Sequence, residues 1–415
     1  MADISRRIGL SLGADICWPA CFEEIVKRLD LEVPVGKDRV RFEVERITIE
    51  PFDLRQPCRY DVVLDRLTHW LMISREWMKK IVVMDDVYVL NNPWSIQADE
   101  KHTTYCAMMR LGFPVPATWM VPQKSYEPSA DLEVTLRRYA KLFDLGKIGR
   151  KVGYPLFMKP YDGGAWVGVT KIDDEAALRA AFEKSGKRLM HVQKAVSPSD
   201  LFVRGLGVGP QVAVFRYDPG APLHARYTTD VGFLSAADEG LVRDMTLTIN
   251  AFFGWDFNSC EALRKDGVFH PIDFANACPD SQVTSLHYHF PWLVKAKVRW
   301  ALFVAATKKK MRKTLDWDPF LEISAGNGTF REKLAGYAAI ARKRFETDRF
   351  EEFSATHLSR LDEVAWEFFG SDVARQAVRA KVAALFPAHE VEEFTEYFWR
   401  KIQDWRRANP APARP

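Results

Sequence analysis

The segment YPLFMKPYDGGAWVGVTKI, residues 154–172, constrains the fold more than any other part of the chain. It predicts a strand, a glycine loop and a second strand, with Lys159 near the end of the first strand. Gly163, Gly164 and Gly168 would let backbone N–H groups approach phosphate oxygens without obstruction from side chains. The segment therefore suits a phosphate-binding turn, and a purely structural glycine turn stays the alternative.

The same glycine loop is not a Walker A loop. Gly163 and Gly168 have the G-x-x-x-x-G spacing, but Val169 and Thr170 stand where Lys and Ser/Thr would be required. A phosphate site here would have to use the lysine of the preceding strand.

A second informative segment is FNSCEALRKDGVFHPIDFANACPD, residues 257–280. Two strands joined by a turn at Asp266–Gly267 would bring Glu261 and Asp273 close together, and Asn276 follows. Carboxylate and amide oxygens are hard ligands that suit Mg²⁺ bound to nucleotide phosphates. Acidic residues on a solvated hairpin are the alternative.

A third segment, HVQKAV at residues 191–196, is an apolar strand that leads into a polar connector with Asp200. Such a connector could act as a hinge between two lobes, and its backbone could bind an adenine edge.

Taken in order, these segments resemble the ATP-grasp superfamily, which includes D-alanine–D-alanine ligase, glutathione synthetase and RimK-type ligases. The resemblance covers roughly residues 90–290. The residues that carry it are ADEKHTTYCAMMRLGFPVP (98–116), PLFMKPYDGGAWVGVTKI (155–172), HVQKAV (191–196) and IDFANACPD (272–280). Four motifs in the family's order share one physical context, which a single motif would not.

The resemblance implies a role for each matching residue. Lys101 and Lys159 would contact nucleotide phosphates, Gln193 and the backbone of 194–196 would face adenine, and Asp200 would meet the ribose. The implied cofactors are ATP and Mg²⁺, with Mn²⁺ as an alternative metal. The full implied set is Lys159 and Arg204 for catalysis, Lys101, Lys159, Gly163, Gly164, Gly168, Gln193, Lys194, Val196 and Asp200 for nucleotide binding, and Glu261, Asp273 and Asn276 for the metal.

The chain departs from the family pattern at several positions. The hinge reads Gln193-Lys194 where many relatives have an acidic residue, and Glu261 stands where Asp is more usual. The last metal pair is spaced D-x-x-N. Ser259 occupies the position of an arginine that many relatives carry, and Arg204 or Arg243 would have to replace it.

The activity that the resemblance implies is ADP-forming ligation of a carboxylate to an amine through an acyl phosphate. Positioning and charge neutralisation are the main requirements of phosphoryl transfer, and lysines, a glycine lid and Mg²⁺ supply both. Two alternatives stay open: a small-molecule kinase, and an inactive nucleotide-binding or scaffold protein. The substrates would be small-molecule or peptide carboxylates and amines, with Arg55, Arg59 or Arg66 as candidate carboxylate contacts.

The expected fold is α/β (α+β), a two-lobed ATP-grasp clamp between a Rossmann-like domain and a helical extension. Predicted strands are 7–12, 44–49, 60–64, 87–90, 189–196, 257–263 and 268–274, with a hairpin at 203–217. Predicted helices are 22–29, 68–83, 98–111 with Asp99 as N-cap, 131–145 ending near Gly146, 175–184 and 239–252. The predicted domains are 1–97, the preATP-grasp domain; 98–190, the small lobe with the glycine lid; 191–291, the large lobe with the metal site; and 292–415, the helical extension.

The composition of the chain limits the kinds of partner and compartment that are expected. The 415 residues include 59 Lys+Arg and 55 Asp+Glu, a net charge of +4, which argues against a general nucleic-acid binder. Six scattered cysteines form no CxxC pair, so the compartment is predicted to be the cytosol. No apolar run approaches a membrane span, so no membrane is expected, and a homodimer stays open. Arg6 and Arg7 before an apolar run resemble a twin-arginine signal, but Asp15 interrupts the run and a first strand is favoured.

Three further features have simple structural explanations. His287 and His289 could form a metal pair but are more simply incidental. The run KKKMRK at 308–313 could meet an anionic surface or acidic substrate, or be a solvated helix end. Residues 326–329, GNGT, could bind an anion at a helix start, but Thr329 as an N-cap is the default.

Overall fold

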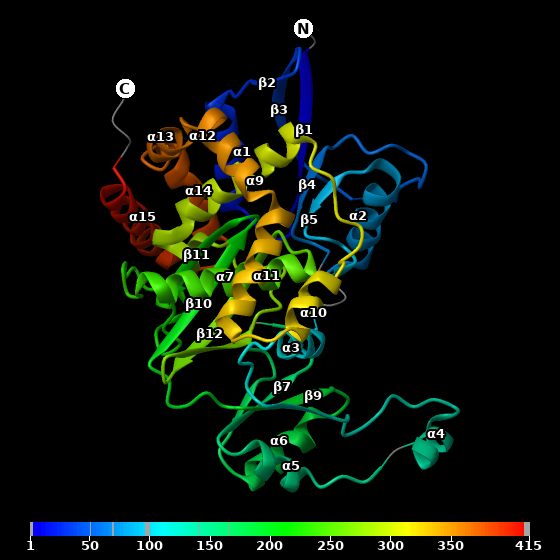
Figure 1. Ribbon diagram of the computed structural model, residues 1–415. Helices are drawn as coiled ribbons and strands as arrows, with labels where there is room; N and C mark the ends of the chain where they lie inside the picture. The colour runs from blue at the N-terminus through cyan, green and yellow to red at the C-terminus, as the bar shows by residue number, and fades with distance from the viewer. Residues whose placement is uncertain are drawn as a thin grey trace. The chain divides into compact units, whose positions relative to one another are not determined.

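A computed structural model describes residues 3–49, 51–68, 70–95, 100–139, 141–164 and 166–410. The chain divides into two compact units (Figure 1). Unit 1 contains residues 1–97, 204–259 and 277–415, and unit 2 contains 98–203 and 260–276. Each unit therefore combines segments that are far apart in the sequence. Asp99, the predicted N-cap, lies outside the described residues.

Unit 1 begins with a small, mainly parallel sheet, as predicted. The order of its strands is β2-β3-β1-β4-β5, and β2 alone pairs in antiparallel fashion. The strands are β1 (Asp3–Ser11), β2 (Val33–Val35), β3 (Asp38–Arg46), β4 (Val62–Asp65) and β5 (Tyr88–Leu90), and the connecting helices are α1 (Cys17–Leu29) and α2 (Met72–Asp85). Ile8 and Leu10 of β1 pair with Val62 and Leu64 of β4, and all four are buried. Such buried central strands are typical of a parallel sheet covered on both faces.

The two arginines near the N-terminus lie inside β1, as the strand interpretation predicts. Arg6 forms an ion pair with Asp61 at 3.1 Å, and Arg7 forms one with Glu43 on β3 at 3.3 Å. Their charges therefore have partners beside the first strand of the sheet.

A second sheet has the order β11-β10-β12-β13 and contains the predicted hairpin. Its strands are β10 (Leu201–Val208), β11 (Gln211–Arg216), β12 (Phe257–Lys265) and β13 (Val268–Asp273). Gly209 makes the turn between β10 and β11 at a φ of 57°, and a Cβ there would lie 2.4 Å from the Trp300 ring. Glycine is therefore required by both the backbone and the packing.

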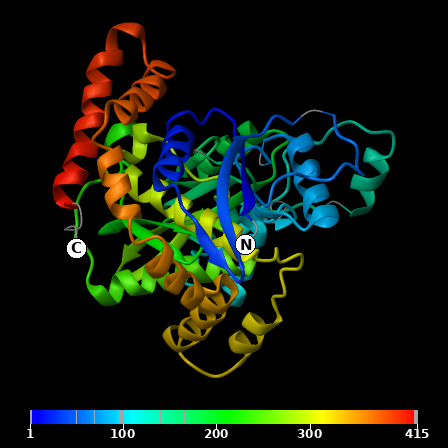
Figure 2. The ribbon, with the colours of Figure 1, turned by 90° about the horizontal axis from the view of Figure 1, so that it is seen from above.

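Residues 201–203 of β10, residues 260–265 of β12 and all of β13 belong to unit 2, and the elements of unit 1 outside the two sheets are helical. Its elements are η2 (Leu223–Ala225), α7 (Ala236–Phe253), α8 (Val283–Leu286), η3 (His287–His289), α9 (Phe290–Thr307), α10 (Asp318–Ala325), α11 (Phe330–Phe345), α12 (Thr347–His357), α13 (Leu361–Phe368), α14 (Asp372–Ala383), η4 (Ala388–Glu390) and α15 (Val391–Ala408). Helix α9 is buried along most of its length and contacts β1, β4, α1 and α12. The C-terminal helices, orange to red in Figure 2, gather around it, with α15 packing on α14 and η3. Thr329 caps α11 in a capping box with Glu332, as the default interpretation expects. No helix in the described ranges is long and apolar enough to span a bilayer.

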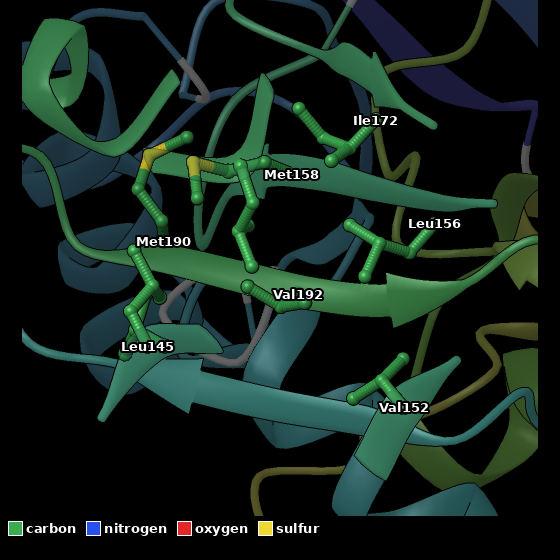
Figure 3. Close-up of a cluster of buried hydrophobic side chains, with 9 residues drawn as sticks. Leu145, Val152, Leu156, Met158, Ile172, Met190 and Val192 are labelled. Atoms are coloured by element: carbon green, nitrogen blue, oxygen red, sulfur yellow. The ribbon is translucent and has the colours of Figure 1, made fainter. Parts of the chain in front are cut away.

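Unit 2 is built on an antiparallel sheet in the order β6-β9-β7-β8. Its elements are α3 (Lys101–Arg110), β6 (Thr118–Val121), α4 (Leu132–Tyr139), α5 (Leu145–Val152), β7 (Leu156–Pro160), β8 (Thr170–Ile172), α6 (Glu175–Ser185) and β9 (Met190–Lys194). Side chains from this sheet and from α5 and α6 form one hydrophobic core (Figure 3): Val121, Leu145, Val152, Leu156, Met158, Ile172, Leu178, Met190 and Val192. This core holds β7 and β9, the two strands next to the glycine loop and hinge segments, in a fixed register.

Two helix predictions need correction. The single helix predicted at 131–145 is wrong: α4 ends at Tyr139, and α5 starts after Asp144, whose side chain accepts from Lys147 N–H. Gly146, expected to end a helix, therefore lies in the first turn of the next one. The helix predicted from residue 68 starts at Met72, because Asp65 accepts the N–H groups of 67 and 68 in a turn.

A buried carboxyl in unit 1 should make stability depend on pH. Asp256 accepts a hydrogen bond from Tyr88 Oη at 2.9 Å, and burial raises the pKa of Asp256 to about 7. The folded state therefore holds a proton that the unfolded state releases near pH 4. This contribution to stability is complete below about pH 4 and is lost as the pH rises to about 7.

We expect Asp256→Asn to flatten this dependence, by at most about 4 kcal/mol between pH 4 and pH 8. Thermal unfolding of both proteins across that range would measure it. The exposed Asp348→Asn is the control and should keep the wild-type profile. Parallel profiles for wild type and Asp256→Asn would contradict the raised pKa.

Candidate nucleotide site

Lys159 is held between two strands of unit 2 and the end of β13. It lies on β7 next to the last residue of the strand, and its side chain is buried. Its ammonium donates to Gln193 Oε1 at 2.6 Å and to the carbonyl oxygen of Ile272 at 3.2 Å. Both acceptors are neutral, so the charge is positioned by these contacts without being cancelled by them.

Lys101 fastens the start of α3 to the glycine loop and to β13. Its backbone N–H donates to the Tyr161 carbonyl at 2.8 Å, and its ammonium donates to the Gly163 carbonyl at 2.7 Å. The same ammonium forms an ion pair with Asp273 at 3.2 Å. The first predicted phosphate lysine, the loop and a predicted metal ligand thus meet at one point.

Burial and neighbouring charges set the protonation of Lys159. The pKa of Lys159 is lowered to about 8, mainly by burial and to a smaller extent by the charge of Lys101. Asp273 and Glu261 raise this pKa, which keeps the group mostly charged at neutral pH. The site therefore contains two cations and two carboxylates whose charges affect one another.

The two carboxylates face each other across a hairpin. Strands β12 and β13 are antiparallel, and Glu261 is directly opposite Asp273 at a bulge. The turn predicted at Asp266–Gly267 is present, with φ of 51° and 75°. Glu261 is buried and Asp273 is partly exposed, while Asn276 lies three residues beyond the end of β13.

These oxygen donors fit a magnesium ion in chemistry but do not complete a coordination shell. Mg²⁺ prefers oxygen ligands and is commonly held by one or two carboxylates together with substrate phosphates and water. Within the described ranges, no cluster of three or more His, Cys, Asp or Glu residues could hold a metal. Glu261 and Asp273 would therefore need phosphate oxygens or water as further ligands.

The glycine loop borders a cavity of about 460 Å³ in unit 2. Gly163 and Gly164 line it together with Lys187 and Arg188. A Cβ on Gly168 would lie 2.6 Å from an Arg188 guanidinium nitrogen, and the φ of Gly168 is 77°. Gly163 and Gly168 thus combine left-handed backbone with nearby cations, an environment that suits phosphate groups.

The side chains of the two hinge residues Gln193 and Lys194 both make contacts within the protein. Gln193 is buried and uses both ends of its amide, since Nε2 donates to Thr118 Oγ1 at 2.8 Å while Oε1 accepts from Lys159. Lys194 donates to the carbonyl oxygens of Gly153 and Tyr154. Their side chains therefore hold the strand and Lys159 in place. The N–H groups of Lys194 and Ala195 also have partners, the carbonyl oxygens of Ala117 and Pro155.

Two other predicted residues have local partners. Asp200 is exposed and forms an ion pair with Arg264 at 2.6 Å, which lowers the pKa of Asp200. Val196 lies two residues after β9 and is half-buried. Arg204 belongs to unit 1, where its guanidinium stacks over Tyr217 at 3.9 Å and donates to Tyr227 Oη at 2.8 Å.

Two residues of the site, Tyr105 and His191, were not predicted from the sequence. Tyr105 donates from its hydroxyl to the Ile272 carbonyl at 2.8 Å and packs edge-on against His191 and Phe274. His191 is opposite Lys159 on β9, and burial lowers its pKa to about 3, so it is neutral. Spacing could have found both: Tyr105 is one helical turn after Lys101, and His191 alternates with Gln193 on β9.

The histidine pair near the metal segment is a structural feature of unit 1. His287 and His289 lie in η3, and not on a strand. His289 Nε2 is 2.7 Å from the Thr228 carbonyl, and burial lowers the pKa of His287 to about 3 and of His289 to about 4.

Comparison with known proteins gives one sequence match. No protein-family model matches the chain. A stretch of 90 residues, 22% of this chain, is 31% identical to D-alanine–D-alanine ligase B of Chromobacterium violaceum. The match spans about a quarter of that relative's length, 24%.

Solved structures of the same kind are similar at low identity. A RimK-domain ATP-grasp protein from Sphaerobacter thermophilus is 15% identical, with a TM-score of 0.48 over 71% of this chain and 99% of that one. A Bacillus anthracis D-alanine–D-alanine ligase complexed with ATP is 14% identical, with a TM-score of 0.47 over 73% and 98%. The VanG D-Ala:D-Ser ligase of Enterococcus faecalis is 12% identical, with a TM-score of 0.45 over 81% and 99%.

The pKa of Lys159 predicts how nucleotide affinity changes with pH. The ammonium is lost as the pH rises through about 8, so ATP affinity should fall roughly tenfold between pH 7.5 and 9.5. Lys159→Arg keeps its charge throughout and should flatten the curve. Titration calorimetry at fixed salt would measure both.

Lys194→Arg is the matched control for this measurement. Lys194 lies on the neighbouring strand, and its ammonium donates to the carbonyl oxygens of Gly153 and Tyr154. That variant should keep the wild-type pH dependence. An equally steep fall in Lys159→Arg would show that another group controls the affinity.

Proposed function

We propose that this protein is an ATP- and Mg²⁺-dependent ligase of the ATP-grasp type that joins a carboxylate to an amine. The observation that supports it most is the meeting of two buried lysines, a glycine loop and a facing carboxylate pair in unit 2, centred on the 3.2 Å contact of Lys101 with Asp273. The relatives named D-alanine–D-alanine ligase support the same reaction class.

The proposed reaction has two steps. A substrate carboxylate oxygen attacks the γ-phosphorus of ATP, so that an acyl phosphate forms and ADP leaves. An amine nitrogen then attacks the acyl carbon, the amide bond forms, and phosphate and a proton are released. No side-chain nucleophile is needed, because both steps depend on positioning and charge neutralisation.

Each part of the candidate site would have a defined task in these steps. Lys101 and Lys159 would bind phosphate oxygens and balance the charge that develops on them. The glycine loop would cover the phosphates with backbone N–H groups and keep water from the acyl phosphate. Glu261 and Asp273 would hold Mg²⁺, and Asn276 is a further candidate ligand. When bound, the ion neutralises phosphate charge.

The same proposal includes the substrates of the enzyme and its location in the cell. The substrates would be a small-molecule or peptide carboxylate and an amine, each recognised outside the phosphate site. The cytosolic location inferred from the scattered cysteines stays a prediction, as does a homodimer. None of the six cysteines, all of which lie in the described ranges, forms a disulfide.

The reaction can be tested on the full chain with ATP, Mg²⁺ and a panel of amino acids and peptides. We expect ADP release that requires both substrates, and hydroxylamine should trap the acyl phosphate as a hydroxamate. A phosphate ester product would indicate a kinase instead. Binding of ATP without turnover over the whole panel would favour the nucleotide-binding scaffold.

The assignment of residues can be tested with two variants. Lys159→Ala and Asp273→Asn should each lower kcat/KM roughly 100-fold or more, because each removes a charge close to the reacting phosphate. Lys124→Ala and Asp173→Asn are the matched controls in unit 2, since both residues are exposed and paired elsewhere. Unchanged ATP–Mg²⁺ binding and kcat/KM in both site variants would exclude the proposed site.

A further inference from the structure

Unit 1 contains a basic cavity that the proposed ligase reaction does not use. It has a volume of about 630 Å³ and is formed by the segment after α9, the start of α10 and the end of α11. These segments are yellow to orange in Figure 1. Seven of its lining residues are basic and two are acidic, a formal excess of five positive charges.

The floor of the basic cavity is rigid. The Arg344 guanidinium donates to the carbonyl oxygens of Ala251 at 3.0 Å and Leu315 at 3.1 Å, and its side chain is 6% exposed. Lys309 donates to the Arg344 carbonyl at 3.1 Å and to Glu346 at 2.7 Å, and its side chain is 7% exposed. Two cations are therefore fixed in place before any ligand arrives.

The rim supplies three further cations that have no carboxylate partner. Lys308, Lys310 and Lys343 are exposed, and none forms an ion pair within the ranges that the structure describes. The two acidic residues are already used, since Glu346 pairs with Lys309 and Asp316 lies against arginines. The positive excess is thus concentrated at the rim.

Helix ends account for only part of this charge. Helices α9 and α11 both end at the cavity, and basic residues commonly stabilise helix C-termini. Each terminus corresponds to roughly half a negative charge, so the two together offset about one of the five positive charges. The remaining excess of about four positive charges has no counterpart in the helix ends.

The volume of the basic cavity and its lining residues indicate which kind of ligand it would bind. The volume lies in the range of small-molecule sites, which is roughly 300–1,000 Å³. Only Pro319 and Ile340 in the lining are apolar, so the ligand should be polar. Arginine forks and lysine ammonium groups together suit phosphate oxygens. A nucleic acid is disfavoured, because the chain has a net charge of only +4 and the basic residues surround a cavity.

We propose that the basic cavity is a binding site for a small molecule that carries two or more phosphate groups. It is an addition to the glycine-loop site, because it is built wholly from residues of unit 1. The proposal does not depend on the ligase activity, so either can fail while the other holds.

Titration calorimetry of the full chain with inorganic tripolyphosphate in EDTA would test it. We expect saturable binding that weakens steeply between 50 and 300 mM NaCl, and roughly tenfold weaker binding of single orthophosphate. The double variant Lys308→Gln/Lys343→Gln should weaken tripolyphosphate binding roughly tenfold. ADP as a second probe would distinguish a nucleotide from an inorganic or sugar-borne polyphosphate.

Two controls separate this site from others. Lys27→Gln/Lys37→Gln removes the same charge from exposed positions elsewhere in unit 1 and should leave binding unchanged. Lys159→Ala should also leave it unchanged, and a loss there would place the ligand at the glycine loop and overturn the proposal. Equal weakening by both lysine pairs, no binding at 5 mM tripolyphosphate, or binding of RNA or polyglutamate alone would also overturn it.

Discussion

The candidate site depends on the contacts that the buried Lys101 ammonium makes with the glycine loop and with Asp273. It is buried, so it loses most of its hydration, and a buried charge is tolerated only where nearby groups replace the lost water. The Gly163 carbonyl at 2.7 Å and Asp273 at 3.2 Å supply that replacement. The start of α3, the glycine loop and the end of β13 must therefore keep this arrangement for the charge to remain stable.

Lys159 shows what happens when a buried lysine has less compensation. Its acceptors are an amide and a carbonyl, and the carboxylates influence it without a hydrogen bond between the side chains. Burial therefore dominates, and the pKa of Lys159 falls to about 8. The phosphates of a bound nucleotide would supply the missing negative charge, so binding and protonation of this lysine should be coupled.

Features that depend on local sequence could be predicted. The strand, loop and strand around Gly163 follow from β-forming residues on either side of glycines, and the Asp266–Gly267 turn sets the pairing of Glu261 with Asp273. The parallel sheet at the N-terminus follows from alternating strands and helices. The single helix predicted at 131–145 was wrong because Asp144 was not recognised as an N-cap. Its side chain accepts from Lys147 N–H and begins a second helix.

Features that depend on distant contacts could not be predicted. The ATP-grasp resemblance implied that Gln193 faces adenine, yet Thr118 and Lys159 use its amide. Their partnership depends on the order β6-β9-β7, which no spacing along the chain reveals. The same holds for Arg204, whose contacts with Tyr217 and Tyr227 require β10 and the segment after β11 to come together.

The distribution of charge adds information that the net charge of +4 does not contain. In unit 2, the two cations Lys101 and Lys159 are matched in number by the carboxylates Glu261 and Asp273. In unit 1, the basic cavity keeps a formal excess of five positive charges after Asp316 and Glu346 are counted. If both proposals hold, the ligand of the basic cavity would be an anion without an accompanying metal, and the nucleotide of the glycine-loop site would bring its metal with it. That difference would follow from local charge and not from the total.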